Sequence, residues 1–186
     1  MKAMQIVSFD GPASGLRYQE VPTPEPGPGQ IAVDVDHAGV GYVEALFTEG
    51  LVPIDLPWTP GLEVSGRVRA LGDGVDGYRA GDAVVALTIT GGGGYGQVAV
   101  APAELVTPLP AGLDPVLAAA VPANSTTALV ALEEIAHLRR GESVLVHAAA
   151  GGLGSQMGQV SRLLGASRVV GVTRSEAKRQ EILDLG

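Results

Sequence analysis

A strand that runs straight into a glycine-rich turn and a helix constrains this chain more than any other feature. Residues 143–148 form a short apolar run with β-branched side chains, which predicts a strand buried between helices on both faces of a sheet. Gly151, Gly152 and Gly154 follow this run. A glycine-rich bend between such a strand and a helix is a common binding place for a pyrophosphate group.

The segments after this turn complete a larger unit. Apolar residues recur near helical spacing over 153–164, which predicts a helix, and residues 168–173 predict a second strand. Residues 143–173 therefore form one strand–helix–strand unit of about 30 residues, the size that a mononucleotide-binding motif requires. Glycine-rich turns also occur for purely steric reasons, so a turn that binds nothing is the alternative.

The turn fits a dinucleotide-binding fingerprint, in which Ala149 replaces the first glycine. Gly151 lets the backbone approach phosphate oxygens, because it has no Cβ. Gly154 lets the helix pack closely on the strand, so that the N–H groups of its first turn point at the anion. We expect the cofactor-binding set to include Ala149, Gly151, Gly152, Leu153 and Gly154.

The end of the second predicted strand distinguishes NAD from NADP. An NAD site usually has Asp or Glu about 20 residues after the glycines, where it binds the ribose hydroxyl. This chain has Thr173 there, followed by Arg174 and, one helical turn later, Lys178. Both basic side chains suit a 2′-phosphate, which predicts NADP(H) as the cofactor. Alternatively, they belong to a solvated helix face together with Arg179 and Glu176.

The composition argues against several classes of function. The net charge is −8, and the basic residues are dispersed except around Arg174, which argues against a nucleic-acid surface. No apolar run reaches the roughly 18 residues of a membrane span. The N-terminus lacks the apolar core and the cleavage site of a signal peptide. We therefore expect a cytoplasmic protein that binds neither nucleic acid nor membrane.

The chain contains no cysteine, which excludes disulfides, a thiolate nucleophile and zinc sites with Cys ligands. The histidines, His37, His137 and His147, show no close metal-ligand spacing, so no metal site is predicted. His147 lies on the predicted buried strand. We expect it to be a packed and hydrogen-bonded core residue rather than a catalyst.

The chain before the nucleotide motif has a different character. Short apolar segments alternate with Gly- and Pro-rich turns, which predicts a compact β-barrel or sandwich. The predicted strands lie within 3–9, 29–40, 63–72, 82–87, 96–102 and 104–110. Residues 113–138 are helical in composition and broken by Pro122. We place the domain boundary near residue 120, giving a barrel over 1–120 and a nucleotide-binding domain over 121–186.

Two motifs resemble the medium-chain dehydrogenase/reductase superfamily. Residues 61–75, followed by Gly81 and Asp82, are similar to the segment of zinc alcohol dehydrogenases that begins Gly-His-Glu, but Leu62 stands at the zinc-binding histidine. This difference is typical of the zinc-free branch. The second motif resembles quinone oxidoreductases and zeta-crystallin. Its matching positions are Gly141, Glu142, Leu145, Ala149, Ala150, Gly151, Gly152, Gly154, Gln159 and Arg162.

This resemblance implies a fold and an activity. The fold would be a GroES-like β-barrel followed by an α/β dinucleotide-binding (Rossmann) domain. The activity would be an NADPH-dependent reduction of a quinone or an enone, with hydride delivered from nicotinamide C4 and without zinc. The substrate would be a small molecule, and the full-length form a possible homodimer.

The resemblance also suggests side chains near the reacting atoms. Thr127 matches a family position near the nicotinamide and could hydrogen-bond its carboxamide, although it could also be a helix hydroxyl bonded back to its own chain. Gly41 and Glu44 stand where relatives often have Asn and Asp, so no substrate role is carried over to them. Tyr42 is the nearest candidate proton donor, or it simply lines the cleft.

The second domain stops early relative to the family pattern. A Rossmann sheet has six strands in the order 3-2-1-4-5-6, and this sequence predicts two of them before Gly186. We therefore expect a fragment or a truncated form of a longer reductase that does not turn over by itself. The alternative function is a non-catalytic module whose barrel serves assembly or partner binding.

Overall fold

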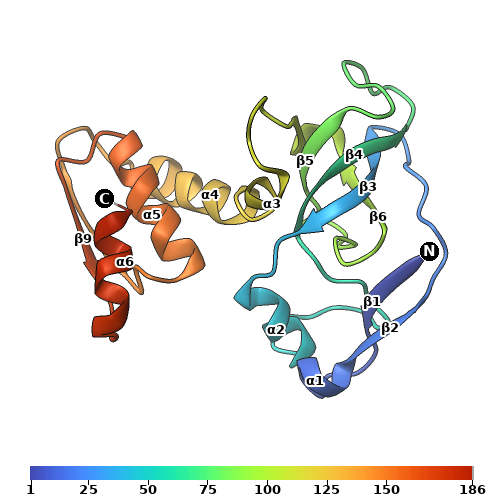
Figure 1. The fold of residues 1–186 in the computed structure, drawn as a ribbon, viewed down its shortest axis with the longest axis horizontal. Coiled ribbons are helices and arrows are strands. Elements are labelled where there is room, and N and C mark those ends of the chain that lie inside the picture. The colour runs from blue at the N-terminus through green and yellow to red at the C-terminus, as the bar shows by residue number, and fades with distance from the viewer. Residues whose placement is uncertain (186) are drawn as a thin grey trace. The chain divides into compact units, whose positions relative to one another are not determined.

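The computed structural model describes residues 1–185, and it divides into two compact units, Met1–Pro122 and Ala123–Gly186 (Figure 1). The division falls beside Pro122, close to the boundary expected near residue 120.

The first unit is built on a five-stranded antiparallel sheet in the order β6-β3-β4-β5-β7. Its strands are β3 (Gln30–Ala38), β4 (Glu63–Leu71), β5 (Ala83–Leu87), β6 (Val98–Pro102) and β7 (Val106–Pro108). The sheet is curled and keeps two edge strands, so the predicted barrel takes the form of a half-open sheet (Figure 1).

Alternating apolar residues create the core of this sheet. Side chains on one face of neighbouring strands meet because successive residues of a strand point to opposite faces. The resulting cluster is aliphatic, which suits the low aromatic content of the chain. Its buried members are Ile31, Val33, Val64, Val68, Val84, Ala86, Ala101 and Val106.

A hairpin, three short α-helices and a 3₁₀ turn (Ala103–Leu105) complete the first unit. Strands β1 (Lys2–Ile6) and β2 (Leu16–Glu20) pair with each other, and single bridges join Ala3 to Gly96 and Ile6 to Trp58. Strand β2 was not expected, because its mostly exposed side chains lack an apolar alternation. The helices are α1 (Pro12–Gly15), α2 (Tyr42–Thr48) and α3 (Pro115–Ala118).

The single tryptophan belongs to a second cluster of the first unit. Trp58 packs against the buried residues Ile6, Phe47 and Leu62. Its ring lies 4.8 Å from that of Phe47, centroid to centroid, in a tilted arrangement. The indole Nε1–H donates to the Gly91 carbonyl oxygen at 3.0 Å. The indole is thus held by a tilted aromatic contact and by a hydrogen bond.

Tyr95 carries a polar group that this unit leaves without a partner. Its hydroxyl oxygen is buried and makes no hydrogen bond with any residue of 1–185. Burial raises the pKa of Tyr95 above its ordinary value, and the negative charges of Glu44 and Glu63 raise it further. The hydroxyl therefore stays protonated and unsatisfied.

The second unit contains the expected strand–helix–strand segment. Its elements are α4 (Pro122–Leu129), a π-helical turn (Val130–Ile135), β8 (Ser143–His147), α5 (Gly152–Leu163), β9 (Arg168–Val172), a 3₁₀ turn (Glu176–Lys178) and α6 (Arg179–Asp184). Strands β8 and β9 are parallel neighbours. Pro122 begins α4 rather than ending a helix, as proline can at a first helical position.

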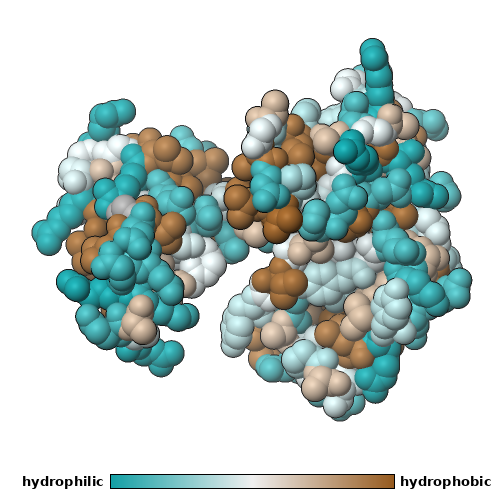
Figure 2. Space-filling view, viewed as in Figure 1, coloured by the Kyte–Doolittle hydropathy of each residue, from teal (hydrophilic) through white to brown (hydrophobic). Residues whose placement is uncertain are grey.

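One expectation about β8 is wrong. Val144 and Val146 face α5, but Leu145 is 59% exposed and His147 is also exposed, so helices cover only one face of this strand within residues 1–185. The cause is that α5 and α6 pack on the same side, over Val146, Val169 and neighbouring residues. His147 is therefore not the packed core residue that its position suggested. Hydrophobic residues also reach the surface elsewhere in both units (Figure 2).

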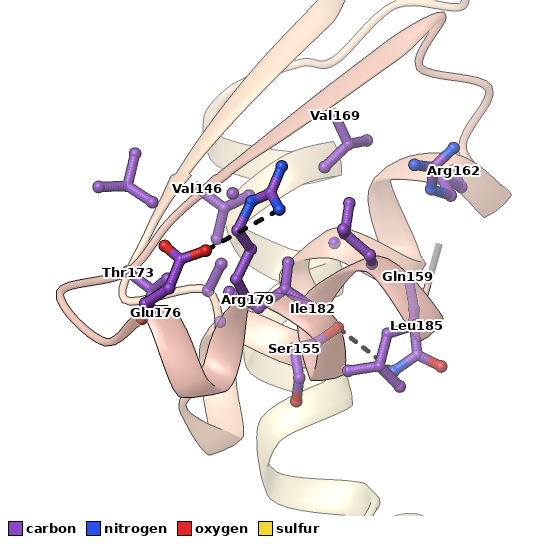
Figure 3. Close-up of a pocket in the computed structure, with 16 residues that line it drawn as sticks. Val146, Ser155, Gln159, Arg162, Val169, Thr173, Glu176, Arg179, Ile182 and Leu185 are labelled. Carbon is purple, nitrogen blue, oxygen red and sulfur yellow. Dashed lines mark hydrogen bonds and ion pairs between the residues drawn. The ribbon is translucent and has the colours of Figure 1, made fainter.

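The helix-covered face of this sheet contains a cavity of about 410 Å³ between α5, β9 and α6 (Figure 3). Gly154 and Gly158 both line it from α5. A Cβ built on Gly158 would meet no atom within 4 Å, whereas a Cβ on Gly154 would overlap the Ala148 carbonyl oxygen. The two glycines thus differ sharply although they lie one turn apart.

Gly158→Ala should stabilise the protein, by about 1 kcal/mol, because alanine favours the helix interior and finds free space. Gly154→Ala should destabilise it by about 1–3 kcal/mol through overpacking. Urea denaturation followed by far-ultraviolet circular dichroism checks both. Equal effects of the two substitutions would contradict the packing described for α5.

Tyr95→Phe should leave stability unchanged or raise it by up to about 1 kcal/mol, because it removes a buried group without a partner. Tyr78 is the matched control, since its hydroxyl donates to the Val106 carbonyl oxygen at 2.6 Å. Tyr78→Phe should lower stability by about 1 kcal/mol. The melting temperature should therefore fall for Tyr78→Phe and stay the same or rise for Tyr95→Phe.

Candidate functional site

The turn between β8 and α5 has a defined geometry. Ala148 adopts a left-handed conformation with φ of 52°, which costs a residue with a side chain about 1–2 kcal/mol. The Gly151 N–H donates to the Ala148 carbonyl oxygen at 2.8 Å, and the Ala149 N–H donates to the Val172 carbonyl oxygen at 3.0 Å. The first hydrogen bond closes the turn, and the second connects it to the end of β9.

The glycines of the turn differ in the space around them. Gly154 confirms the expected close packing, since any side chain there would strike the backbone of Ala148 and Ala149. Gly151 precedes α5 and is exposed, with the Ala148 carbonyl oxygen 3.2 Å from its would-be Cβ as the one near atom. A Cβ on Gly152 would lie 3.2 Å from Asn124 Nδ2. The turn therefore presents bare backbone at Gly151.

A basic hollow of about 530 Å³ opens beside this bare backbone. It brings together four of the residues expected to bind the cofactor: Gly151, Thr173, Arg174 and Lys178. Its remaining lining residues are His147, Ala148, Ala150 and Val172. None of these residues is acidic, although the chain as a whole carries a net charge of −8. The hollow therefore suits an anion.

The basic residues near the end of β9 differ in their ion-pair contacts. Arg179 lies 3.9 Å from Glu176 in an exposed ion pair, as expected for a solvated helix face (Figure 3). Among residues 1–185, neither Arg174 nor Lys178 forms an ion pair. Thr173 accepts a hydrogen bond from the Ser175 N–H at 3.2 Å, which shapes the loop that carries Arg174. Arg174 and Lys178 thus keep their charges available.

A second hollow, of about 310 Å³ and mainly apolar, lies beside the same turn. Leu145, Leu153 and Met157 line it together with Gly151 and Gly154, and His147 lines both hollows. The predicted residues Ala149 and Gly152 line neither hollow, and Ala149 is buried against the cavity of Figure 3.

Thr127 lies on α4 in the same unit but lines neither hollow. Its hydroxyl donates to the Ala123 carbonyl oxygen at 2.7 Å, so it is at present bonded back to its own helix. Another hydroxyl of α4 has a partner outside its own helix, since Ser125 donates to Gln156 Oε1 of α5 at 2.9 Å. A role for Thr127 at the cofactor stays a prediction.

Tyr42 belongs to the first unit, where it begins α2 and is 80% exposed. Glu44 is buried and accepts a hydrogen bond from the Gly41 N–H at 3.0 Å. Its carboxylate therefore caps the start of α2, as acidic residues often do. A catalytic role for Tyr42 stays a prediction.

Sequence reasoning missed some residues of the site. His147 was expected in the core, Ala148 gave no signal beyond its place in the turn, and Ala150 was noted only as a position of the motif that resembles quinone oxidoreductases. The position of His147 at the end of β8, next to the glycines, was the signal that could have identified it. The approach of Asn124 to Gly152 depends on tertiary packing and has no sequence signature.

Within residues 1–185, no group of three or more His, Cys, Asp or Glu side chains is arranged to hold a metal ion. Leu62 packs with Ile6 and Phe47 in the apolar cluster of the first unit. No helix in the described part of the chain is both long and apolar enough to cross a membrane.

Comparisons with known proteins agree with this architecture. Residues 27–111 match the alcohol dehydrogenase GroES-like domain. The chain is 37% identical over 186 residues to the synaptic vesicle membrane protein VAT-1 homolog-like of Mus musculus, covering 99% of this chain and 44% of that protein. It is 36% identical over 188 residues to the quinone oxidoreductase of Rattus norvegicus, covering 100% of this chain and 56% of that one.

Solved structures give the same result. The human VAT-1 homolog-like protein aligns with a TM-score of 0.91 at 36% identity, over 100% of this chain and 59% of its own. A mycobacterial protein complexed with NADPH aligns with a TM-score of 0.89 at 33% identity, over 100% and 57%. The chain spans about half the length of the relatives it matches. With its GroES-like domain followed by a strand–helix–strand segment, the chain is similar along its whole length to proteins of the medium-chain dehydrogenase/reductase superfamily.

Proposed function

We propose that this protein is an NADPH-dependent oxidoreductase that transfers hydride to a quinone or an enone without zinc. The observation that carries the proposal is the basic hollow beside Gly151, which no acidic side chain lines. The similarity to quinone oxidoreductases and to an NADPH-complexed structure supports it. We also propose that the substrate is a small molecule and that the protein is cytoplasmic.

The residues of the turn fit the anionic parts of NADPH. The first N–H groups of α5 would bind the pyrophosphate, because the start of a helix has N–H groups without helical acceptors, and the absence of a side chain at Gly151 would let the phosphate approach them. Arg174 and Lys178 would bind the 2′-phosphate, one through a planar fork and the other as a compact charge. Leu153 would lie beside the cofactor in the apolar hollow.

When bound, NADPH supplies the hydride from nicotinamide C4, so no protein nucleophile is required. The protein would orient the nicotinamide, keep the site dry and polarise the acceptor oxygen. Thr127 would hydrogen-bond the carboxamide by turning its hydroxyl away from Ala123. Tyr42 is the proposed donor to the acceptor oxygen. Leu62, which packs among apolar side chains, supports a reaction without a metal Lewis acid.

Gly151→Val should weaken NADPH binding at least about tenfold, equivalent to about 1.4 kcal/mol, because its side chain would occupy the place of a phosphate oxygen. Enhancement of NADPH fluorescence on binding measures this effect. Gly158→Ala, on the buried side of the same helix, is the control and should bind as the unmodified chain does. Intact binding in Gly151→Val would refute the phosphate assignment.

Arg174→Ala and Lys178→Ala should each lower the preference for NADPH over NADH about tenfold or more, because each removes a charge-assisted contact worth about 1.5–3 kcal/mol. Arg179→Ala is the matched control, since Arg179 pairs with Glu176 instead. Titrations of each variant with both cofactors give the ratio of affinities. A loss of preference in Arg179→Ala equal to that in Arg174→Ala would favour a non-specific effect of charge.

Turnover is measured separately from binding, as the oxidation of NADPH by a quinone. Quinone-dependent oxidation at roughly 1 to 10³ per second would support the reductase and contradict the expectation that this chain alone does not turn over. Binding without turnover would agree with that expectation. A chain that binds no NADPH would favour the alternative, a non-catalytic module.

A further inference from the structure

His147 is an unexpected member of the nucleotide site. It is the last residue of β8 and is exposed, and neither of its ring nitrogens is hydrogen-bonded to any residue of 1–185. An imidazole at this place has two nitrogens available to a ligand. The other histidine of this unit differs, because His137 Nδ1 lies 3.2 Å from the Glu133 carbonyl oxygen at the end of its helical turn.

The surroundings of His147 point to an anionic ligand. It lines the basic hollow with Arg174 and Lys178, and it lines the apolar hollow with Leu145 and Leu153. No carboxylate lines either hollow. The charged groups that share a hollow with the imidazole are thus the guanidinium of Arg174 and the ammonium of Lys178, while β8, β9 and α5 contribute only uncharged side chains beside it.

The imidazole lies between the two parts of the site. Gly151 and Ala148 also line both hollows, so His147 belongs to the strip of surface that joins them. A dinucleotide that extends from the basic hollow across the bare backbone of Gly151 must pass along this strip. Its pyrophosphate is the anionic group that would come within reach there.

We propose that His147 is a phosphate-binding residue of this site, and that its imidazole gains a proton when the dinucleotide binds. This inference rests on the proposed function and extends it to a residue outside the fingerprint. Histidine is the side chain that changes charge between pH 5 and 8. An imidazolium binds a phosphate oxygen more strongly than a neutral imidazole does, because the hydrogen bond is then charge-assisted.

The sign of the pH effect follows from linkage. If the complex holds more protons than the free components, affinity rises as the pH falls. The 2′-phosphate acts in the opposite sense, since a phosphate monoester loses charge as the pH falls towards about 6. Arginine and lysine side chains titrate well above pH 8. A comparison with a variant that lacks the imidazole cancels the contribution of the cofactor.

The test measures the dissociation constant of NADPH at pH 6 and pH 8 for the unmodified chain and for His147→Gln. Glutamine retains a hydrogen-bond donor but cannot take up a proton. The ratio of the two affinities, unmodified over variant, should be about tenfold larger at pH 6 than at pH 8. His137→Gln, an exposed histidine outside both hollows, should show a ratio near one at both pH values.

Calorimetry provides a second readout. Titration with NADPH in two buffers of different ionisation enthalpy should show proton uptake by the unmodified chain and much less by His147→Gln or His147→Ala. If the affinity ratio is the same at both pH values and the proton uptake is unchanged, the inference about His147 is wrong while the cofactor assignment stands. If the unmodified chain binds no NADPH at either pH, the proposed function itself is overturned, and this inference with it.

Discussion

The second unit depends on the contact between α5 and the turn that precedes it. At Gly154 the helix approaches the backbone of Ala148 and Ala149 so closely that no side chain fits. This approach fixes the direction of the helix relative to β8 and holds its first turn beside the exposed backbone of Gly151. A separate hydrogen bond from the Ala149 N–H to the Val172 carbonyl oxygen holds the end of β9 next to the turn. The basic hollow lies between the parts of the chain that these two contacts bring together.

The sequence predicted this segment well because its signals are local. The apolar run of β8, the helical spacing of α5 and the glycines between them each have one structural interpretation at short range. Strand β2 was missed because it is held by backbone pairing with β1, and its mostly exposed side chains leave no apolar pattern. The misplacement of His147 had another cause. The apolar run predicts a strand covered on both faces, whereas α5 and α6 pack on the same face.

The candidate site could be predicted only in part, because the sequence indicates which residues converge but not which contacts their side chains make. Gly151, Thr173, Arg174 and Lys178 converge because a strand–helix–strand unit brings both strand ends to one edge of the sheet. The separation of Arg179 from this group was not predictable, since it depends on which side chain Glu176 pairs with. Likewise, the local pattern around Glu44 could not show that its carboxylate caps α2. Both contacts join residues three positions apart, and the residue types allow these contacts without singling them out from other partners.

The position of Trp58 has a practical consequence for spectroscopy. The only indole of the chain packs against Phe47 in a tilted arrangement and donates a hydrogen bond to the Gly91 carbonyl oxygen, within the first unit. Its emission therefore reports the state of the curled sheet, whereas the α/β segment contains no such fluorophore. Tryptophan fluorescence during denaturation therefore follows the first unit, and a second probe is needed to follow the α/β segment.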